Sequence, residues 1–366
     1  MTYGHGLIVG KFYPPHAGHH ALIDAAAAAC DRLTVVVAPS RRESIPLEPR
    51  LSWLREAHGN VTFVGVYDDH PIDYADPQVW DLHMAVFRAA AGTDRVDAVF
   101  SSEAYGVELA RRFHAVPVIV DLDRTAVPVS GTAIRADPVA HWNSLGPGAR
   151  GWLAKRVIVV GAESTGTTTM ARALARHFRL RGGVWAGTRW VPEYGRELTE
   201  RKLAALRRRR PDATVFDVTW DRDDFATVAT EQNAAEDAAA RAGSPVLFGD
   251  TDAFATTIWE ERYLGSTSPA VRAQVRPPDL YLLTDDVGVP FDDDGLRDGE
   301  SIRPWMTGRF RSELAAQGVP HHVLTGGYAQ RLRAAVSATD AVLARGWQFA
   351  TPLRPAVDSA LNNVGP

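Results

Sequence analysis

The chain has 366 residues, 45% of them hydrophobic and 23% charged, a length and composition that predict two or three globular domains. Its formal net charge of −4 gives no support to a duplex-DNA binder, and its single cysteine, Cys30, excludes an intrachain disulfide and a cysteine-based zinc cluster. No apolar run is long enough to span a bilayer and the N-terminus is unlike a signal peptide, so we expect a cytoplasmic protein.

Short apolar runs alternate with helix-forming segments over the first 120 residues. This alternation predicts an α/β fold with a parallel sheet, helices on both faces and ligands at the carboxyl ends of the strands. The predicted strands are residues 7–9, 33–38, 61–67, 98–101 and 116–120, and the predicted helices are 21–30, 48–58, 79–91 and 105–113.

A second α/β domain is expected after a stretch rich in proline and glycine, residues 137–151, which predicts a linker or a closing helix with loops. A strand at 156–160 then begins another strand-loop-helix unit. Two further strands at 246–248 and 280–283 and a late helix at 328–344 complete the prediction. We place the domains at 1–150 and 155–350, and expect a loosely held tail at 351–366.

The segment G-K-F-Y-P-P-H-A-G-H, residues 10–19, directly follows the first predicted strand. This segment begins a predicted helix and contains two histidines three residues apart. The N-terminus of a helix has free backbone N–H groups that bind phosphate. An isolated H-x-x-H pair would favour two surface histidines. The whole string, however, resembles the signature of the nucleotidylyltransferase superfamily, whose members move an adenylyl or cytidylyl group from a nucleoside triphosphate to a phosphate acceptor.

A second signature of that superfamily is matched by V-S-G-T-A-I-R at residues 129–135, which alone would be read as a helix cap. The resemblance implies in-line attack of an acceptor phosphate on the α-phosphate of ATP, with catalysis by positioning and charge stabilisation. The residues expected to be catalytic are Lys11, His16, His19 and Arg135, and those expected to bind ATP are Gly10, Phe12, Gly18, Ser130, Gly131 and Thr132.

Arg50 and Trp53 lie three residues apart on the second predicted helix and so share a face. They are candidates to grip an acceptor phosphate and to stack on a flat ring. A core tryptophan beside a surface arginine is the open alternative.

The second domain begins with a strand, a glycine- and threonine-rich loop and a helix, with the spacing G-x-x-x-x-G-K-[ST] of a P-loop. Thr167 stands where the lysine is expected, while the backbone N–H groups remain to bind phosphate. Residues expected at the phosphates are Gly161, Ser164, Thr165, Gly166, Thr167, Thr168 and Thr169.

Further along the chain, the apolar strand that ends at Asp250 is typical of a Walker B strand. Thr168 and Asp250 are expected to hold Mg²⁺, largely through water, and Asp252 to act on a substrate hydroxyl. A glycine-bearing loop at 294–299 predicts a lid that brings Arg297 and Arg303 over the phosphates. The basic run at 207–210 is interpreted as a solvated helix face, with nucleic-acid binding as the minority interpretation.

The pairing of these two domains resembles the bifunctional nicotinamide-nucleotide adenylyltransferase/ribosylnicotinamide kinase family, the NadR type. The motifs that carry the resemblance are residues 10–19, 129–135, 161–168, 193–197, 248–259 and 294–299. It implies that the second half phosphorylates nicotinamide riboside and that the first half joins the mononucleotide to AMP, giving NAD. By this resemblance Glu193, Tyr194 and Arg196 line the riboside pocket, and Asp250 and Asp252 handle Mg²⁺ and the 5′-hydroxyl.

The expected partners are ATP, nicotinamide mononucleotide, nicotinamide riboside and NAD, with Mg²⁺ as cofactor and no nucleic acid. We also expect no membrane insertion and a homo-oligomer. Some members of the family begin with a DNA-binding domain; here the first predicted strand begins by Leu7, so no repressor function is expected.

Thr167 motivates a different hypothesis, in which the second half is a non-catalytic nucleotide sensor. The loss of such a charge from a phosphate site costs several kcal/mol of transition-state stabilisation. Arg297, Arg303 and Lys155 are the candidates to compensate. A third hypothesis keeps the fold and assigns the first half another phosphate acceptor.

Overall fold

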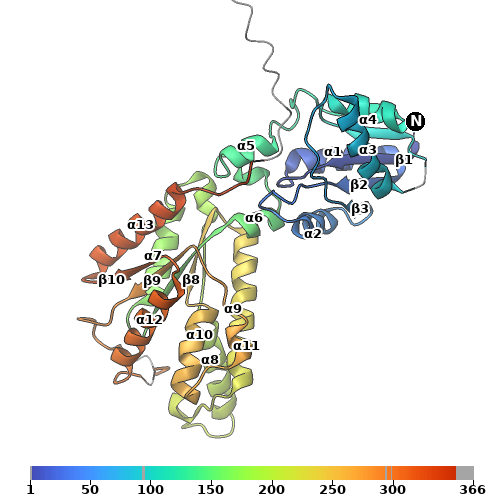
Figure 1. Cartoon of the computed structure of the whole chain (residues 1–366). Helices are drawn as coiled ribbons and strands as arrows, with labels where there is room; N and C mark the ends of the chain where they lie inside the picture. Colours follow the sequence, from blue (N-terminus) through green and yellow to red (C-terminus); the bar gives the residue numbers. More distant parts are fainter. Residues whose placement is uncertain (1, 93–94, 293–294, 298, 352–366) are drawn as a thin grey trace, which may run out of the picture. The chain divides into compact units, whose positions relative to one another are not determined.

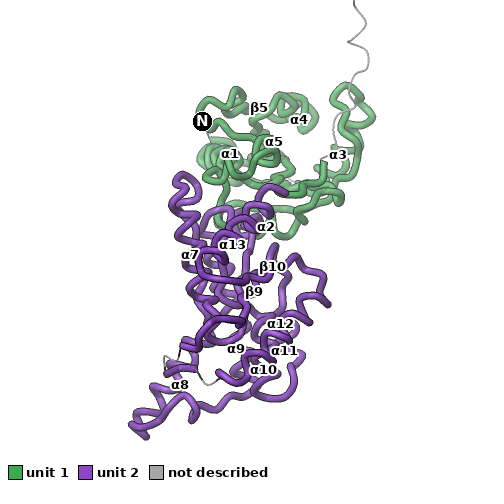
Figure 2. The backbone as a smooth tube through the Cα atoms, turned by 90° about the vertical axis from the view of Figure 1, so that its left-hand side faces the viewer, with its two compact units in different colours: residues 1–149, 347–366 green, residues 150–346 purple. Residues whose placement is uncertain are grey.

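The computed structural model describes residues 2–92, 95–292, 295–297 and 299–351 (Figure 1). The chain divides into two compact units, one formed by 1–149 with 347–366 and the other by 150–346 (Figure 2). Each unit holds one five-stranded sheet in which every strand pairs with its neighbours in parallel. The predicted α/β class with two parallel sheets is therefore confirmed.

The first sheet has the strand order β3-β2-β1-β4-β5. Its strands are β1 (Tyr3–Gly10), β2 (Cys30–Val37), β3 (Thr62–Gly65), β4 (Ala98–Ser101) and β5 (Val116–Ile119). The helices of this part of the chain are α1 (Ala17–Ala29), α2 (Leu47–Ala57), α3 (Pro77–Ala91), α4 (Tyr105–Phe113), α5 (Gly131–Ala136) and α6 (Pro147–Leu153), with a 3-10 turn η1 (Trp142–Ser144).

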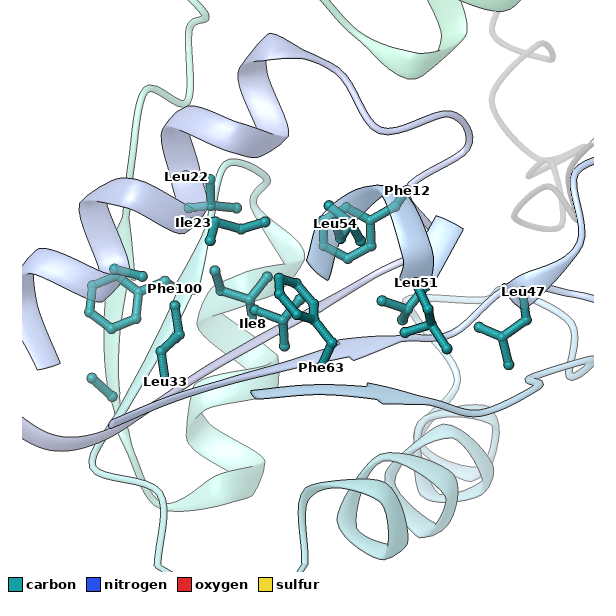
Figure 3. Close-up of a cluster of buried hydrophobic side chains, with 14 residues drawn as sticks. Ile8, Phe12, Leu22, Ile23, Leu33, Leu47, Leu51, Leu54, Phe63 and Phe100 are labelled. Atoms are coloured by element: carbon teal, nitrogen blue, oxygen red, sulfur yellow. The ribbon is translucent and has the colours of Figure 1, made fainter. Parts of the chain in front are cut away.

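Alternating side chains of β1 enter two cores, one on each face of the sheet. Ile8 packs with Ile23 of α1 and Leu54 of α2, as Figure 3 shows. Leu7 and Val9 pack on the opposite face, in a cluster that contains residues of α3 and α4. Burial on both faces explains why this strand reads as a continuous apolar run.

The second sheet has the order β10-β9-β6-β8-β7. Its strands are β6 (Lys155–Gly161), β7 (Arg189–Val191), β8 (Val246–Asp250), β9 (Leu280–Thr284) and β10 (His321–Leu324). The helices are α7 (Thr167–Arg179), α8 (Tyr194–Arg207), α9 (Arg222–Ala242), α10 (Ala253–Leu264), α11 (Pro269–Arg272), α12 (Arg303–Gln317) and α13 (Tyr328–Ala344), with 3-10 turns η2 (Gly183–Gly187) and η3 (Val215–Asp217).

β6 divides its side chains between two cores in the same way. Val157 and Val159 pack in a cluster with residues of α7 and α13, whereas Ile158 and Val160 pack with residues of α10 and α12. The sheet is thus covered on both faces, and the loop that follows β6 begins at the carboxyl end of a central strand.

The chain after Gly346 belongs to the first unit, so the second unit ends four residues before the expected bound of 350. Two contacts account for this: the Trp347 ring lies 6.4 Å from the Trp142 ring, and the Tyr13 hydroxyl donates to the carbonyl of Ala350 at 3.2 Å. Of the expected tail, 352–366 lies outside the described residues.

Among the helices of the described ranges, none is both long enough and apolar enough to cross a membrane.

Candidate functional site

The turn after β1 brings the first signature to the carboxyl end of the sheet. β1 lies between β2 and β4, where the order of the strands reverses and a crevice forms in sheets of this kind. Phe12 turns the chain with a φ of 51° and its buried ring lies 4.7 Å from that of His19. His16 then caps α1, because its Nδ1 accepts the backbone N–H of Gly18 at 3.2 Å.

The two histidines of the signature lie against each other, with ring centroids 3.7 Å apart and planes inclined by 31°. They come from the first turn of one helix, since His19 follows the N-cap by three residues. Both rings line a cavity of about 370 Å³.

The second signature lies beside these rings. A Cβ at Gly131 would be 3.9 Å from Nε2 of His16, an ordinary contact, and 3.1 Å from Nη1 of Arg135, which would have to shift slightly to admit it. Arg135 donates to the carbonyl of Tyr13 at 2.6 Å and to the hydroxyl of Thr132 at 3.1 Å. The two segments, more than 100 residues apart in the chain, therefore contact each other directly.

The residues of both signatures that we expected at the site line the same cavity. Those that line it are Gly10, Lys11, Phe12, His16, Gly18, His19, Ser130, Gly131, Thr132 and Arg135. Ser130 has a second role, because its hydroxyl caps α5 by accepting the N–H of Ala133 at 3.1 Å.

The electrostatics of the cavity keep both imidazoles uncharged. Burial, followed by the charges of Arg124, His20 and Arg135, lowers the pKa of His16 to about 3. Burial and the neighbouring His16 ring likewise lower the pKa of His19 well below its ordinary value. A neutral His16 whose Nδ1 accepts from Gly18 carries its proton on Nε2. The ring is therefore a hydrogen-bond donor next to Gly131.

Arg50 and Trp53, the candidates to grip an acceptor phosphate and to stack on a flat ring, do not line this cavity. Arg50 is fully buried: its guanidinium pairs with Glu43 at 2.7 Å and donates to the carbonyls of Lys11 at 2.6 Å and of Ile45. Trp53 packs against Gly148, where an added Cβ would meet its indole at 2.2 Å. Arg50 thus supports the loop that follows β1, and Trp53 packs α2 against α6.

Lys11 lines the cavity while its ammonium group pairs with Glu43 at 3.1 Å. Glu43 thus joins Lys11 to the buried Arg50. The lysine is held by the same carboxylate that fixes the loop.

Sequence reasoning missed several cavity residues, among them Arg124. Its charge contributes to the lowered pKa of both histidines, and its guanidinium donates to Glu103 at 3.2 Å. Asp68, His70 and His83 also line the cavity and contact one another. No spacing pattern marks these residues, because loops after β3 and β5 and one helix bring them together.

In the second unit, the loop after β6 has the backbone of a phosphate-binding loop. Gly166 has a φ of 91° at the N-cap of α7, and an added Cβ at Gly161 would lie 2.2 Å from the hydroxyl of Thr284. Thr165 fixes the loop from inside by donating to the carbonyl of Ala162 at 2.7 Å. Free N–H groups at the start of this 13-residue helix favour an anion.

Asp250 ends β8 beside this loop and contacts the hydroxyl of Thr168. Its other oxygen, Oδ1, is buried and accepts no hydrogen bond from the described residues. Burial raises the pKa of Asp250, against the lowering effect of Thr168 and Thr167. A buried carboxylate oxygen next to a hydroxyl group suits Mg²⁺, which prefers oxygen ligands, so the donor set fits this ion.

Glu193 lies close to the same carboxylate. Burial and the charges of Asp250 and Glu163 raise its pKa to about 8, while Arg196 and Arg297 act in the opposite direction. Glu193 and Arg196 thus both lie near Asp250. The Tyr194 hydroxyl, by contrast, accepts a hydrogen bond at 2.8 Å from Arg201, which lies seven residues further along the same helix.

Both carboxylate oxygens of Asp252 accept hydrogen bonds from the protein. Its Oδ1 accepts the N–H of Ala255 at 2.9 Å and so caps α10, and its Oδ2 accepts the hydroxyl of Tyr281 at 2.7 Å. The side chain is buried with both oxygens in use. Asp252 therefore stabilises the start of α10, and its expected action on a substrate hydroxyl stays a prediction.

Of the three cations expected to replace the P-loop lysine, only Arg297 reaches the loop. Its Nη1 donates to the Ser164 hydroxyl at 3.2 Å. Arg303 is buried and donates to the carbonyl of Val289 at 3.0 Å. Lys155 stands at the opposite end of β6 and pairs with Asp279 at 3.0 Å. Residues 294 and 298 of the expected lid lie outside the described residues.

The neutral state of His16 predicts an acid-sensitive first unit. In the unfolded chain His16 takes up a proton near pH 6.5, and in the fold near pH 3. Its contribution to stability is therefore complete above pH 6.5 and is lost as the pH falls towards 3, with a limiting slope of about 1.4 kcal/mol per pH unit. We expect His16→Asn to show a shallower decrease in the free energy of unfolding between about pH 6.5 and pH 4, measured by urea denaturation. Equal slopes would contradict the assignment.

Comparison with known proteins shows which proteins this chain resembles in sequence. A family described as "AAA domain" matches residues 156–331. The "Trifunctional NAD biosynthesis/regulator protein NadR" of Escherichia coli K12 is 26% identical over 319 residues, which cover 81% of this chain and 72% of that protein. The protein of the same name from Salmonella typhimurium LT2 is 25% identical over 316 residues, with the same coverage.

Two solved structures share the fold over nearly the whole chain. "Crystal structure of NadR protein in complex with NR" has a TM-score of 0.71 at 24% identity and covers 96% of this chain and 98% of that one. "Crystal structure of NadR protein in complex with NAD and AMP-PNP" has a TM-score of 0.70 at 23% identity and covers 93% and 96%. The resemblance predicted from the sequence motifs is confirmed: over most of its length, the chain is similar to the NadR proteins.

Proposed function

We propose that the first unit transfers the adenylyl group of ATP to nicotinamide mononucleotide, giving NAD and pyrophosphate. The observation that carries this proposal is the meeting of the two signatures in one cavity, with His16, His19, Arg135 and Gly131 around the same space. The similarity to proteins named for NAD biosynthesis supports nicotinamide mononucleotide as the acceptor.

In this mechanism the phosphate of the mononucleotide attacks the α-phosphate of ATP in line, and pyrophosphate leaves. The acceptor is already an anion, so the reaction needs no strong base. His16 donates from Nε2 to the phosphate, and His19, packed against it, stabilises the charge that develops in the transition state. Arg135 and Arg124, which both line the cavity, hold the β- and γ-phosphates.

Keeping both histidines neutral serves this chemistry. Neutral donors in a buried site are oriented in advance and need no reorganisation when charge develops. Burial of the pair is therefore part of the proposed mechanism.

We propose that the second unit transfers the γ-phosphate of ATP to the 5′-hydroxyl of nicotinamide riboside. The backbone of the loop after β6 holds the phosphates, and Thr168 and Asp250 are the residues that would hold Mg²⁺. When bound, Mg²⁺ neutralises charge on the transferred phosphoryl group. Glu193, with a pKa raised to about 8, takes the hydroxyl proton in place of Asp252.

Arg297 supplies the positive charge that Thr167 lacks. It reaches the loop at Ser164 from a segment far along the chain, and its charge lowers the pKa of Glu193 in the same cluster. This contact favours a working kinase over the non-catalytic sensor.

The histidine pair provides the first test. We expect His19→Ala to lower kcat for NAD formation from ATP and nicotinamide mononucleotide by at least ~10², with KM changed less, because the ring acts mainly at the transition state. His141→Ala removes a histidine that does not line the cavity and is expected to keep the normal rate. Near-normal turnover of His19→Ala would remove this ring from the mechanism.

The second unit is tested by supplying nicotinamide riboside, ATP and Mg²⁺ and by measuring mononucleotide formation. Arg297→Ala is expected to reduce this rate by roughly 10²-fold or more, the effect of losing a transition-state cation. Arg209→Ala, on the exposed basic run, is the matched control. Asp250→Asn is expected to abolish the reaction while leaving adenylyl transfer to added mononucleotide intact.

Two outcomes would select the alternatives. If the wild-type chain binds ATP in its second unit but never forms mononucleotide, the sensor hypothesis replaces the kinase. If pyrophosphate release with ATP or CTP is faster with another phosphate acceptor than with nicotinamide mononucleotide, the acceptor assignment is wrong and the nucleotidyl transfer stands.

A further inference from the structure

A cluster of Asp68, His70 and His83 lies on the cavity wall of the first unit, and neither signature contains any of its members. Asp68 and His70 follow β3, and His83 projects from α3. One ligand atom from each residue lies within 4.8 Å of the other two. Two imidazoles and a carboxylate converge on one point of the wall.

Both imidazoles direct the same ring atom at the carboxylate. Nδ1 of His70 lies 2.8 Å from Oδ1 of Asp68, and Nδ1 of His83 lies 2.5 Å from Oδ2. The other nitrogen of His83, Nε2, lies 2.9 Å from the carbonyl oxygen of Pro71. Histidines that bind metals are held in this way, with one nitrogen towards the ion and the other N–H donated to a carbonyl or carboxylate.

The backbone fixes the carboxylate before any ion arrives. The N–H of Asp68 donates to the carbonyl of Pro39 at 3.0 Å, and the N–H of His70 donates to Oδ1 of Asp68 at 3.2 Å. Only 5% of the Asp68 side chain is exposed. A buried carboxylate in a fixed position, unlike an exposed acidic group, requires a cationic partner.

The carboxylate of Asp68 lies between the two rings, because each of its oxygens faces a ring nitrogen of a different histidine.

We propose that Asp68, His70 and His83 form a binding site for a divalent transition-metal ion such as Zn²⁺ or Co²⁺, with its remaining coordination positions open to the cavity. The donor set selects this class, because imidazole nitrogen suits these ions whereas Mg²⁺ prefers oxygen ligands. The ion takes the place of the protons between the rings and the carboxylate. Water, or an anionic oxygen of a molecule in the cavity, completes its coordination.

The site is separate from the Mg²⁺ that accompanies ATP. Its three ligands belong to the protein, and binding needs neither nucleotide nor turnover. Metal binding and adenylyl transfer can thus succeed or fail independently, so a negative result for one is distinct from a negative result for the other.

The test is a titration of the full-length, metal-free chain with Co²⁺ in the absence of nucleotides, followed by the visible d–d absorption of the ion. We expect about one equivalent to bind with the spectrum of a nitrogen-containing site, and Zn²⁺ to displace it. His70→Asn and His83→Asn are each expected to weaken binding by roughly 100-fold or more. His58→Asn is the matched control: it breaks the separate His20–His58 contact of 2.8 Å and is expected to bind Co²⁺ as the wild type does.

Three results would overturn the proposal. These are no saturable Co²⁺ binding by the wild type, an absorption spectrum typical of oxygen ligands alone, and equal affinities of the wild type and both cluster variants. His70 has the most exposed side chain of the cluster, at 37%, so its variant is the least disturbing to the fold. Circular dichroism verifies the fold of each variant. If a variant misfolds, the Co²⁺ spectrum of the wild type and the displacement of Co²⁺ by Zn²⁺ decide whether the site exists.

Discussion

The packing of two buried imidazoles against each other at the start of α1 is the constraint on which the first site depends. His16 and His19 lie 3.7 Å apart, and burial holds both in the neutral form. Around them lie the tight turn after β1, Gly131 of the second signature, and Arg135, which ties the second signature to the first by donating to the carbonyl of Tyr13.

The charges around this space are arranged in two layers. Arg135 and Arg124 line the cavity, whereas Arg50 lies behind it and is neutralised by Glu43. In the second unit, the positive charge beside the loop after β6 comes from a different part of the chain. This loop lacks the usual lysine, and the guanidinium of Arg297 reaches the loop from a distant segment. Proteins can supply charge to a phosphate site from any element that the fold brings close enough.

Much of the fold follows from the sequence, because buried strands are continuous apolar runs and the helices between them have helical composition. The short edge strands β7 and β10 were not predicted, since half-exposed runs of three and four residues resemble loops. The signatures located His16, His19 and Arg135, because the residues of each signature are consecutive. Spacing could not reveal that Arg50 and Asp252 are occupied by buried partners, nor that loops bring Asp68 and Arg124 to the cavity.

The protonation state of His16 gives the most direct test of this account. Nitrogen-15 NMR of the histidine rings near pH 6 is predicted to show a neutral ring protonated on Nε2, whose Nε2 resonance shifts when ATP is added. An imidazolium at that pH, or a ring resonance that ATP leaves unchanged, would contradict the claim that a buried, neutral histidine meets the nucleotide's phosphates.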